Sequence, residues 1–358
     1  MSEKPAALTR RTLGQLAASL PLLAPAAGAF AQGLAQRPLV RVAFGSCADQ
    51  NEPQPIWDAV LAYRPEMFLF MGDNVYGALK TNDLAEVEAA YTRSRSIEGY
   101  VRLRQTVPHQ AIWDDHDYGI NDGGVENPFK ERSKAAFLDF WNVPENDVRR
   151  SRPGLYYAHA VGAPGQRLQV VFLDTRWFRS PLRPTDRRGA PGRERYLPDE
   201  DPAKTMLGET QWQWLRGVLT EPADLRLIVS SVQVVADGHG WERWGNMPLE
   251  RQKLYDLVGE TKANGVVFLS GDRHIGALYR ESRNTPYPLI DATSSGLNKF
   301  FAAAKEDGPN RIGALFALPN FGTADIDWWE RTVTLSIRDE GGLSRRQVTL
   351  KLDELRAS

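Results

Sequence analysis

The sequence is poor in the features that mark several common protein classes. Its single cysteine, Cys47, excludes an internal disulfide. It has no G-x-S-x-G motif, which sets a serine hydrolase aside. With 44 Lys plus Arg against 45 Asp plus Glu, the formal net charge is −1, and nothing indicates a stable nucleic-acid partner. No apolar run reaches the ~20 residues that a membrane-spanning helix needs, so we expect no integral membrane segment in the mature chain.

The first 31 residues have the order of features found in an export signal. Arg10 and Arg11 precede a mildly apolar stretch at 13–23, and small residues follow up to Ala31. This order is typical of a twin-arginine signal peptide that is cleaved after Ala31. An amphipathic or disordered tail is the alternative.

A membrane anchor is disfavoured in this region because Pro21 and Pro25 interrupt the apolar stretch. We therefore expect a signal peptide at 1–31, a linker at 32–38 and one domain at 39–358. The twin-arginine export machinery would be a partner, and the mature protein would be periplasmic or secreted.

Strand and helix patterns alternate along most of the remaining chain. Short apolar runs predict strands at 40–44, 67–71, 110–113, 154–159, 168–173, 227–235, 266–269, 277–281, 289–293, 332–337 and 347–352. Helical periodicity predicts helices that begin at Pro55 and that cover 83–95, 130–141, 209–219 and 249–260. Residues 180–202, dense in Pro, Arg, Gly and Asp, predict a long surface loop. The alternation indicates an α/β layered fold.

Side chains that can bind metal follow four of the predicted strands. They are Cys47, Asp73, the acidic run 114–117 with His116, and Asp272 with His274. Because ligands of α/β sheets bind at the carboxyl ends of the strands, we expect these four groups to converge on one site.

Each of these residues also has an ordinary structural interpretation. Asp73 could form a turn or cap a helix, Tyr76 could pack in the core, and Cys47 could be a small buried hydrophobe. A lone histidine is more often a hydrogen-bonded core residue, but Asp272 two positions away favours His274 as a ligand. His239, between two glycines, could line the pocket.

The acidic run 114–117 is the strongest of these signals. Asp114, Asp115 and Asp117 lie within four residues beside His116, and such carboxylates repel one another unless a cation neutralises them. A solvated acidic loop is the alternative, which the preceding apolar strand disfavours.

Five short motifs together resemble the ordered motif set of the PhoD-like metallophosphatases, relatives of the calcineurin-type metallophosphoesterases. They are Phe-Gly-Ser-Cys at 44–47, Gly-Asp-Asn-Val-Tyr at 72–76, Trp-Asp-Asp-His-Asp at 113–117, Ser-Ser-Val-Gln at 230–233 and Gly-Asp-Arg-His at 271–274. The resemblance covers about 40–298. It implies an α/β fold in the form of a four-layer αββα sandwich, with two mixed sheets flanked by helices.

The resemblance also implies roles for individual residues. Asp73 would bridge the metals, Cys47 and Tyr76 would hold a ferric ion, and Asp272 and His274 would complete the coordination. Asp115 stands where the wider superfamily has an asparagine ligand, and His116 where it has the histidine that contacts phosphate. Further oxygen ligands would be Asn121 and Gln233.

Ligand chemistry independently favours two kinds of metal. Thiolate and phenolate suit iron, whereas carboxylate and amide oxygens suit calcium. We therefore expect Fe³⁺ and Ca²⁺, with Mn²⁺ or Zn²⁺ as alternatives.

The sequence thus predicts an exported, metal-dependent phosphoesterase that acts on small phosphorylated substrates, monoesters or diesters, by attack of a metal-bound hydroxide on phosphorus. His116 would stabilise charge or protonate the leaving group, with Asp115 in the same catalytic set. Arg176 and Arg273 would contact phosphate, or else form structural ion pairs.

Two alternatives remain open at this point. The same metal core could serve a phosphodiesterase or phospholipase-type hydrolase, for which a tryptophan such as Trp241 near the site would suit a base or acyl group. A non-catalytic metal- or phosphate-binding relative is the other alternative, and the presence of both His116 and His274 argues against it.

Overall fold

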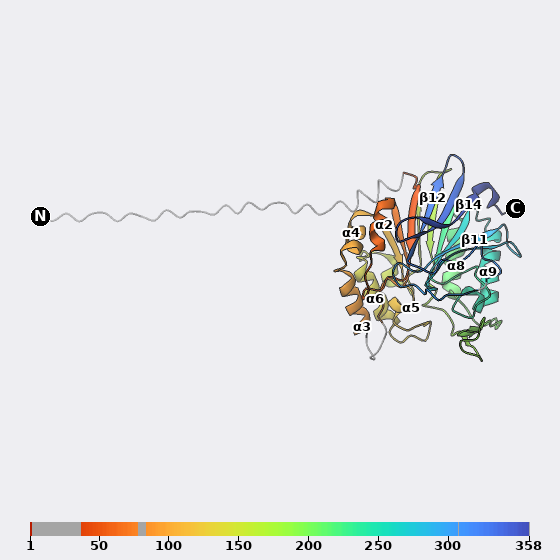
Figure 1. The fold of residues 1–358 in the computed structure, drawn as a ribbon, viewed down its shortest axis with the longest axis horizontal. Coiled ribbons are helices and arrows are strands. Elements are labelled where there is room, and N and C mark those ends of the chain that lie inside the picture. The colour runs from red at the N-terminus through yellow and green to blue at the C-terminus, as the bar shows by residue number, and fades with distance from the viewer. Residues whose placement is uncertain (2–36, 78–83, 307, 358) are drawn as a thin grey trace.

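A computed structural model describes residue 1 and residues 37–77, 84–306 and 308–357 (Figure 1). The predicted signal peptide and most of the predicted linker therefore lie outside the described residues, apart from Met1. Among the described residues, no helix combines the length and the apolarity needed to cross a membrane.

The first six-stranded sheet combines strands from the two ends of the domain. Its order is β14-β13-β12-β1-β2-β3. Its strands are β1 (Arg41–Gly45), β2 (Met67–Met71), β3 (His109–Ile112), β12 (Asn320–Asp327), β13 (Thr332–Asp339) and β14 (Ser344–Lys351). β1, β2 and β3 are parallel to one another. β12 pairs antiparallel with β1, and β13 and β14 continue the sheet as antiparallel neighbours. The sheet is therefore mixed.

The second six-stranded sheet has the order β10-β11-β9-β8-β5-β4. Its strands are β4 (Tyr157–Val161), β5 (Leu168–Phe172), β8 (Leu225–Ser230), β9 (Val266–Ser270), β10 (Gly276–Glu281) and β11 (Leu289–Ser294). β5, β8, β9 and β11 are parallel, and the two edge strands are antiparallel. Strands β2, β5, β8 and β9 are buried along their whole length, as expected for parallel strands that are covered on both faces.

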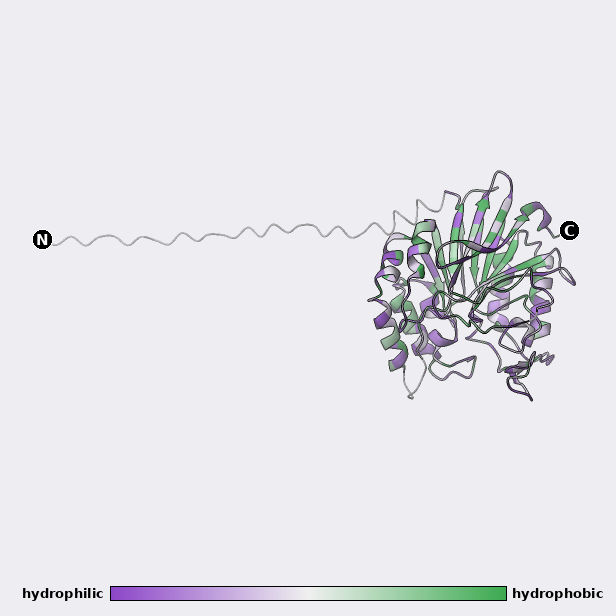
Figure 2. Ribbon diagram, in the orientation of Figure 1, coloured by the Kyte–Doolittle hydropathy of each residue, from purple (hydrophilic) through white to green (hydrophobic). Residues whose placement is uncertain are grey.

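Helices cover the outer faces of the two sheets. They are α2 (Ile56–Tyr63), α3 (Ala85–Ser94), α4 (Glu98–Thr106), α6 (Lys130–Phe140), α8 (Gly208–Thr220) and α9 (Pro248–Glu260). Two single-turn helices, α5 (Asp115–Tyr118) and α7 (Val148–Ser151), lie in the connections between elements. In Figure 1, α2, α3, α4 and α6 lie on one side of the strands and α8 and α9 on the other. Figure 2 shows hydrophobic strands between these helical layers. The predicted four-layer α/β sandwich is confirmed.

The helices pack through the apolar faces that their periodicity predicts. In α2 the buried side chains are Ile56, Trp57 and Val60, and Trp57 contacts Phe68 of β2 edge-to-face at 5.8 Å between ring centroids. In α8 the buried set includes Trp212 and Leu215. Burial of these stripes fixes both helices to the sheets.

Several segments differ from the sequence prediction. The strand predicted at 154–159 begins later, at β4, and the one predicted at 227–235 ends at Ser230. Helices α4, α5 and α7 and strand β12 were not predicted. The loop at 180–202 is present, with a short β6 (Arg183–Pro184) paired to β7 (Tyr196–Leu197). The 3₁₀ turns η1 (Trp244–Asn246) and η2 (Leu352–Glu354) complete the described elements.

Candidate metal centre

The two sheets meet where several of their strands end. Ser46, after β1, pairs with Ser295, after β11, as an isolated parallel bridge. Between the same edges, the Ser231 hydroxyl donates to Asp114 Oδ1 at 2.5 Å, which joins the end of β8 to the end of β3. The predicted ligands therefore come from both sheets to one place.

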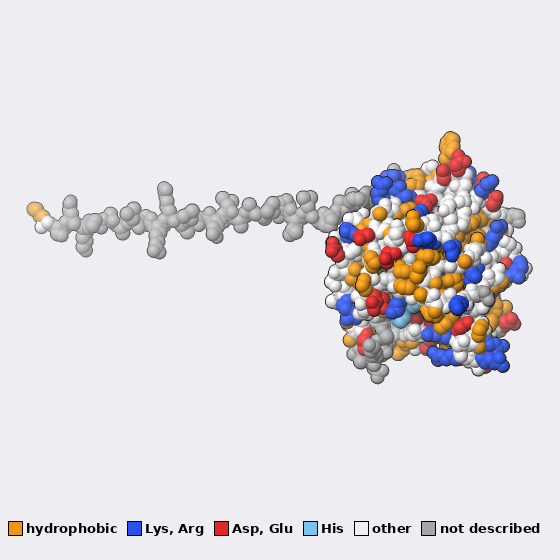
Figure 3. Space-filling view, viewed as in Figure 1, with side chains coloured by type: hydrophobic (Ala, Val, Ile, Leu, Met, Phe, Trp, Pro, Cys, Tyr) orange, Lys and Arg blue, Asp and Glu red, His pale blue; other side chains and the backbone are white. Residues whose placement is uncertain are grey.

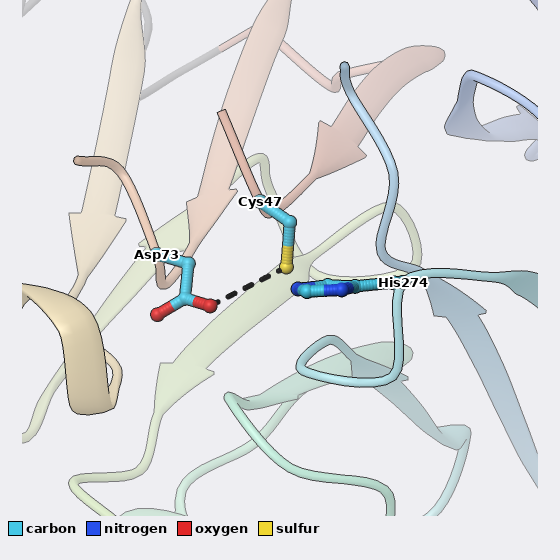
Figure 4. Close-up of side chains that lie close together, drawn as sticks. All are labelled: Cys47, Asp73 and His274. Carbon is cyan, nitrogen blue, oxygen red and sulfur yellow. Dashed lines mark hydrogen bonds between the residues drawn. The ribbon is translucent and has the colours of Figure 1, made fainter. Parts of the chain in front are cut away.

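Cys47, Asp73, Tyr76 and His274 form one end of the cluster. Figure 4 shows the Cys47 sulfur between the Asp73 carboxylate and the His274 ring. The thiol donates to Asp73 Oδ2 at 3.5 Å. The Tyr76 hydroxyl donates to the same oxygen at 3.1 Å and lies 3.0 Å from His274 Nε2. Cys47 and Tyr76 thus both bond to one Asp73 oxygen, and His274 joins the group through the Tyr76 hydroxyl.

The other oxygen of Asp73 faces the acidic run. His116 donates its backbone N–H to Asp73 Oδ1 at 3.2 Å, and its ring packs 4.3 Å from that of Tyr76. Asp115 Oδ2 accepts the Asp122 backbone N–H at 2.7 Å. Because its other oxygen, Oδ1, is buried without a hydrogen-bond partner in the described structure, Asp115 has a free acceptor inside the site.

Four groups of metal-competent side chains overlap in this region. Within each group, the candidate ligand atoms lie within 4.8 Å of one another. The groups are Cys47–Asp73–His274, Asp73–Asp115–His116, Asp114–Asp115–Asp272 and Asp122–Glu242–Asp272. Since each group shares a carboxylate with the next, the arrangement can hold more than one cation side by side.

The backbone at this cluster is held in an unusual conformation. Cys47, Asp73, Asp122, Asp272 and His274 have φ values of 64°, 47°, 51°, 68° and 57°. They make up half of the ten non-glycine residues with positive φ in the described chain. The left-handed region costs about 1–2 kcal/mol per non-glycine residue. Such strain gathers at functional sites, where surrounding contacts hold it in place.

Burial makes several of these groups difficult to ionise on their own. It raises the pKa of the Cys47 thiol to about 11, and it raises the pKa of Asp272 well above the ordinary value, assisted by the charge of Asp114. For Tyr76, burial and then the charge of Asp73 raise the pKa well above its usual range. Thiolate and phenolate ligands form in such a place only when a cation offsets the burial.

The pKa values of the two central carboxylates, Asp73 and Asp115, shift in opposite directions. Burial and the charge of Asp115 raise the pKa of Asp73. Burial alone would also raise the pKa of Asp115, but the charges of His116 and Arg176 outweigh it and lower that pKa. Of this tightly coupled pair, Asp73 is therefore the carboxyl that holds a proton more readily. Burial lowers the pKa of His274 to about 4, which leaves its ring nitrogen free to bind a metal near neutral pH.

Arg176 lies beneath the cluster rather than in its cavity. The side chain is fully buried, and its guanidinium pairs with Asp114 at 2.5 Å and with Glu242 at 2.8 Å. Arg179 also pairs with Glu242, at 3.2 Å. For Arg176 this geometry favours the structural ion pair over the phosphate contact.

Gln233 and Asn121 are placed differently from the other predicted ligands. Gln233 is fully buried; its amide donates to Tyr279 and Thr293, and its Oε1 lies 3.0 Å from His239 Nε2. His239 Nδ1 accepts the Trp241 backbone N–H at 3.2 Å, so Nε2 carries the proton and donates to Gln233. The Gln233 carbonyl oxygen thus already has one donor. Asn121 is exposed and lines the cavity.

A cavity of about 240 Å³ opens onto the cluster. Its lining residues are Asp73, Asp115, His116, Asn121, Asp122, Arg195, Trp241, Glu242, Asp272, Arg273, His274 and Phe301. Asp122, Arg195, Glu242 and Phe301 were not predicted. No motif marks them, and they reach the site only through the fold. Arg273, as predicted, faces the cavity, and it also pairs with Glu306.

Comparison with known proteins identifies the family. The model of the PhoD-like phosphatase family matches residues 42–297. The chain belongs to this family. The matched residues include the candidate ligands from Cys47 to His274, so the family resemblance seen in the motifs is confirmed.

Individual relatives of this PhoD-like chain are distant. Alkaline phosphatase D of Bacillus subtilis (strain 168) is 22% identical over 282 residues, which are 66% of this chain but 46% of that protein. The solved structure described as PhoD matches with a TM-score of 0.66 and 16% identity, covering 89% of this chain and 69% of that one.

A plant enzyme has the same fold. Purple acid phosphatase PPD1 from yellow lupin (Lupinus luteus) seeds matches with a TM-score of 0.58 and 12% identity, over 88% of this chain and 54% of that chain. At these identities, the structural matches establish the fold alone.

Proposed function

We propose that this chain is an exported, metal-dependent phosphoesterase that hydrolyses phosphate monoesters, diesters or both. The observation that carries the proposal is the series of overlapping ligand groups that share Asp73, Asp115 and Asp272 at the floor of one cavity. Membership of the PhoD-like phosphatase family supports it.

The donor set fits bound metal ions. Buried carboxylates at 4.8 Å or less from one another, with a free oxygen on Asp115, favour a cation in their midst. We assign Fe³⁺ to Cys47, Tyr76 and His274, and Ca²⁺ to the carboxylate-rich side, with Mn²⁺ or Zn²⁺ as alternatives. When bound, such ions lower the pKa of coordinated water and stabilise charge on phosphoryl oxygens.

The remaining site residues orient the substrate and move the proton. His116 lines the cavity next to Asp73, where its ring can donate to the leaving oxygen of the ester. Arg273 offers a planar set of donors to the phosphate, in competition with Glu306. Asp115 is held in place by the Asp122 N–H. Asn121 and Gln233 stay proposed oxygen ligands; Gln233 would have to share its carbonyl oxygen with His239.

The first test pairs elemental analysis of the purified mature protein with hydrolysis assays. We expect bound iron and calcium, together with hydrolysis of p-nitrophenyl phosphate or bis-p-nitrophenyl phosphate that chelation removes. The ratio of the two rates decides between monoester and diester preference. A folded, metal-free and inactive wild-type protein would refute the proposal.

Two variants separate metal binding from proton transfer. Asp73→Asn should lose both metal and activity, since it removes a shared ligand. His116→Asn should keep its metal while kcat falls by about 10²–10⁴, the usual contribution of an acid–base group. His159→Asn, on the edge strand β4, is the matched control and should match the wild type. Metal loss in His116→Asn would make that residue a ligand instead.

A further inference from the structure

Two aromatic side chains line the same cavity as the candidate ligands without serving the metal chemistry. They are Trp241, between β8 and η1, and Phe301, after β11. The other lining residues are charged or polar, except for this pair. Neither ring stacks on another aromatic ring among the described residues, although most aromatic side chains of the core do. Neither ring is therefore committed to an aromatic partner.

Phe301 is fixed to the site but open to solvent. Its backbone N–H donates to the carbonyl oxygen of His274 at 2.8 Å, so its position follows that of a candidate ligand. The side chain is nevertheless 43% exposed, and the neighbouring Phe300 is 39% exposed. A phenylalanine whose backbone is anchored and whose ring is left partly in water offers apolar surface that a substrate can cover.

Trp241 is held by charge instead of by apolar packing. The guanidinium carbons of Arg273 and Arg195 lie 4.7 Å and 5.2 Å from its ring centroid. Arg195 is in turn paired with Asp122 at 2.6 Å, which anchors the long loop at the cavity. Since a cation against an aromatic ring is attracted by its π-electrons, the two arginines restrict the ring.

The surface around the site extends this apolar character. Figure 3 shows hydrophobic side chains gathered on one face of the molecule, with a histidine side chain visible beside them. Exposed Leu318 precedes Asn320, whose backbone N–H donates to the Gly296 carbonyl oxygen. A Cβ on Gly296 would lie 3.5 Å from Phe300 Cβ, which places Phe300 at the same turn.

We propose that Trp241 and Phe301 form a subsite for an apolar substituent of the phosphoester, next to the carboxylates that handle the phosphate. This inference rests on the proposed function and narrows its substrate class. The preferred substrate then carries an aryl or alkyl group on phosphate, and esters of small polyols bind less well. Phe301 is a specificity-determining residue in this scheme and takes no part in the chemical step.

The test compares KM for phenyl phosphate, hexyl phosphate and glycerol 1-phosphate in the metal-containing enzyme. In Phe301→Ala the ratio of KM for phenyl phosphate to KM for glycerol 1-phosphate should rise about tenfold, the upper size of an aromatic contact. Phe301→Leu, which keeps an apolar side chain, should lie between the wild type and Phe301→Ala. If the subsite recognises any apolar group, the KM for hexyl phosphate should rise in Phe301→Ala as the KM for phenyl phosphate does. If it recognises only rings, the KM for hexyl phosphate should stay unchanged.

The matched control is Trp329→Ala, which removes an aromatic ring that is 90% exposed in the turn between β12 and β13. Its KM ratio should equal that of the wild type. A ratio within twofold of the wild type in Phe301→Ala would overturn the subsite while leaving the phosphoesterase in place. A metal-containing wild-type protein that hydrolyses neither these three monoesters nor bis-p-nitrophenyl phosphate would instead overturn the proposed function, and the subsite with it.

Discussion

His239 shows how a single buried group links the site to the stability of the fold. Its ring is 3% exposed, bonds to Gln233 and Trp241, and has no carboxylate among its hydrogen-bond partners. Burial, followed by the charges of Arg273 and Arg243, lowers the pKa of His239 well below its ordinary value. The ring is therefore neutral in the folded protein at pH values where the unfolded chain already binds a proton.

This difference predicts a pH dependence of folding. A histidine whose folded pKa is depressed lowers the free energy of unfolding as the pH falls below the unfolded value of about 6.5. When the pH is lowered from 7.5 to 5.5, the free energy of unfolding of the wild type should fall by about 1.4 kcal/mol more than that of His239→Gln. Urea titrations of both proteins at matched metal content measure this difference. An equal loss in the two proteins would contradict it.

At the scale of elements, the turns after the strands decide where the ligands point. Gly72 closes β2 with a φ of +107°, and a Cβ there would lie 2.5 Å from the Asp114 Cβ. The end of β2 can therefore approach the acidic run only because position 72 has no side chain. Gly165, in the turn between β4 and β5, has a similar φ of +90° but open space around it.

The pair Gly72→Ala and Gly165→Ala separates backbone strain from steric contact. Gly165→Ala should lower the free energy of unfolding by about 1–2 kcal/mol, the cost of a left-handed residue with a side chain. Gly72→Ala should cost a further ~1–3 kcal/mol from overpacking, and it should reduce the metal bound per protein because Asp73 moves. Urea unfolding and elemental analysis measure both effects. An equal loss in the free energy of unfolding at the two positions would show that the chain accommodates the contact with Asp114 without further loss of stability.

The elements that were predicted correctly are those whose own residues decide their structure. Fully apolar runs such as 67–71 and 266–269 form strands in any context that buries them. β12, with the sequence Asn-Phe-Gly-Thr-Ala-Asp-Ile-Asp, has two aspartates and a glycine, and becomes a strand only because β1 and β13 flank it. Its Gly322 is needed because a Cβ there would lie 2.0 Å from the Phe44 ring.

The candidate site likewise contains residues that the sequence predicted and residues that it did not. Cys47, Asp73, Asp115 and His274 could be predicted because each lies within a few residues of the end of a strand. Local sequence gives no sign of Glu242, which reaches the site through its ion pairs with Arg176 and Arg179. Long-range pairing of this kind is set by the fold and leaves no periodic pattern.

At the scale of the whole molecule, the described domain begins at the edge of the predicted signal and linker. Leu39 is 1% exposed, and its carbonyl oxygen accepts the Trp328 indole N–H at 2.8 Å. Packing of the core therefore starts within a few residues of the predicted cleavage site after Ala31. Removal of 1–31 should leave these contacts intact.

The predicted twin-arginine signal peptide can be tested by export. Replacing Arg10 and Arg11 by lysine should leave the precursor in the cytoplasm, because the twin-arginine route reads that pair. Arg37→Lys, beyond the predicted cleavage site, is the matched control and should be exported like the wild type. Cell fractionation with mass spectrometry of the mature N-terminus measures both. Normal export of the double variant would rule out this route.

The pairing of β1 with β12 has a consequence for biosynthesis. Arg41 of β1 and its partner Asp325 are about 280 residues apart, so one side of β1 stays unpaired until the ribosome has translated nearly the whole chain. At 5–20 residues per second, this wait is on the order of 15–60 s. During that time the nascent chain exposes a strand edge that can pair with other chains. A chain released before residue 320 would therefore be an aggregation-prone fragment and not a smaller enzyme.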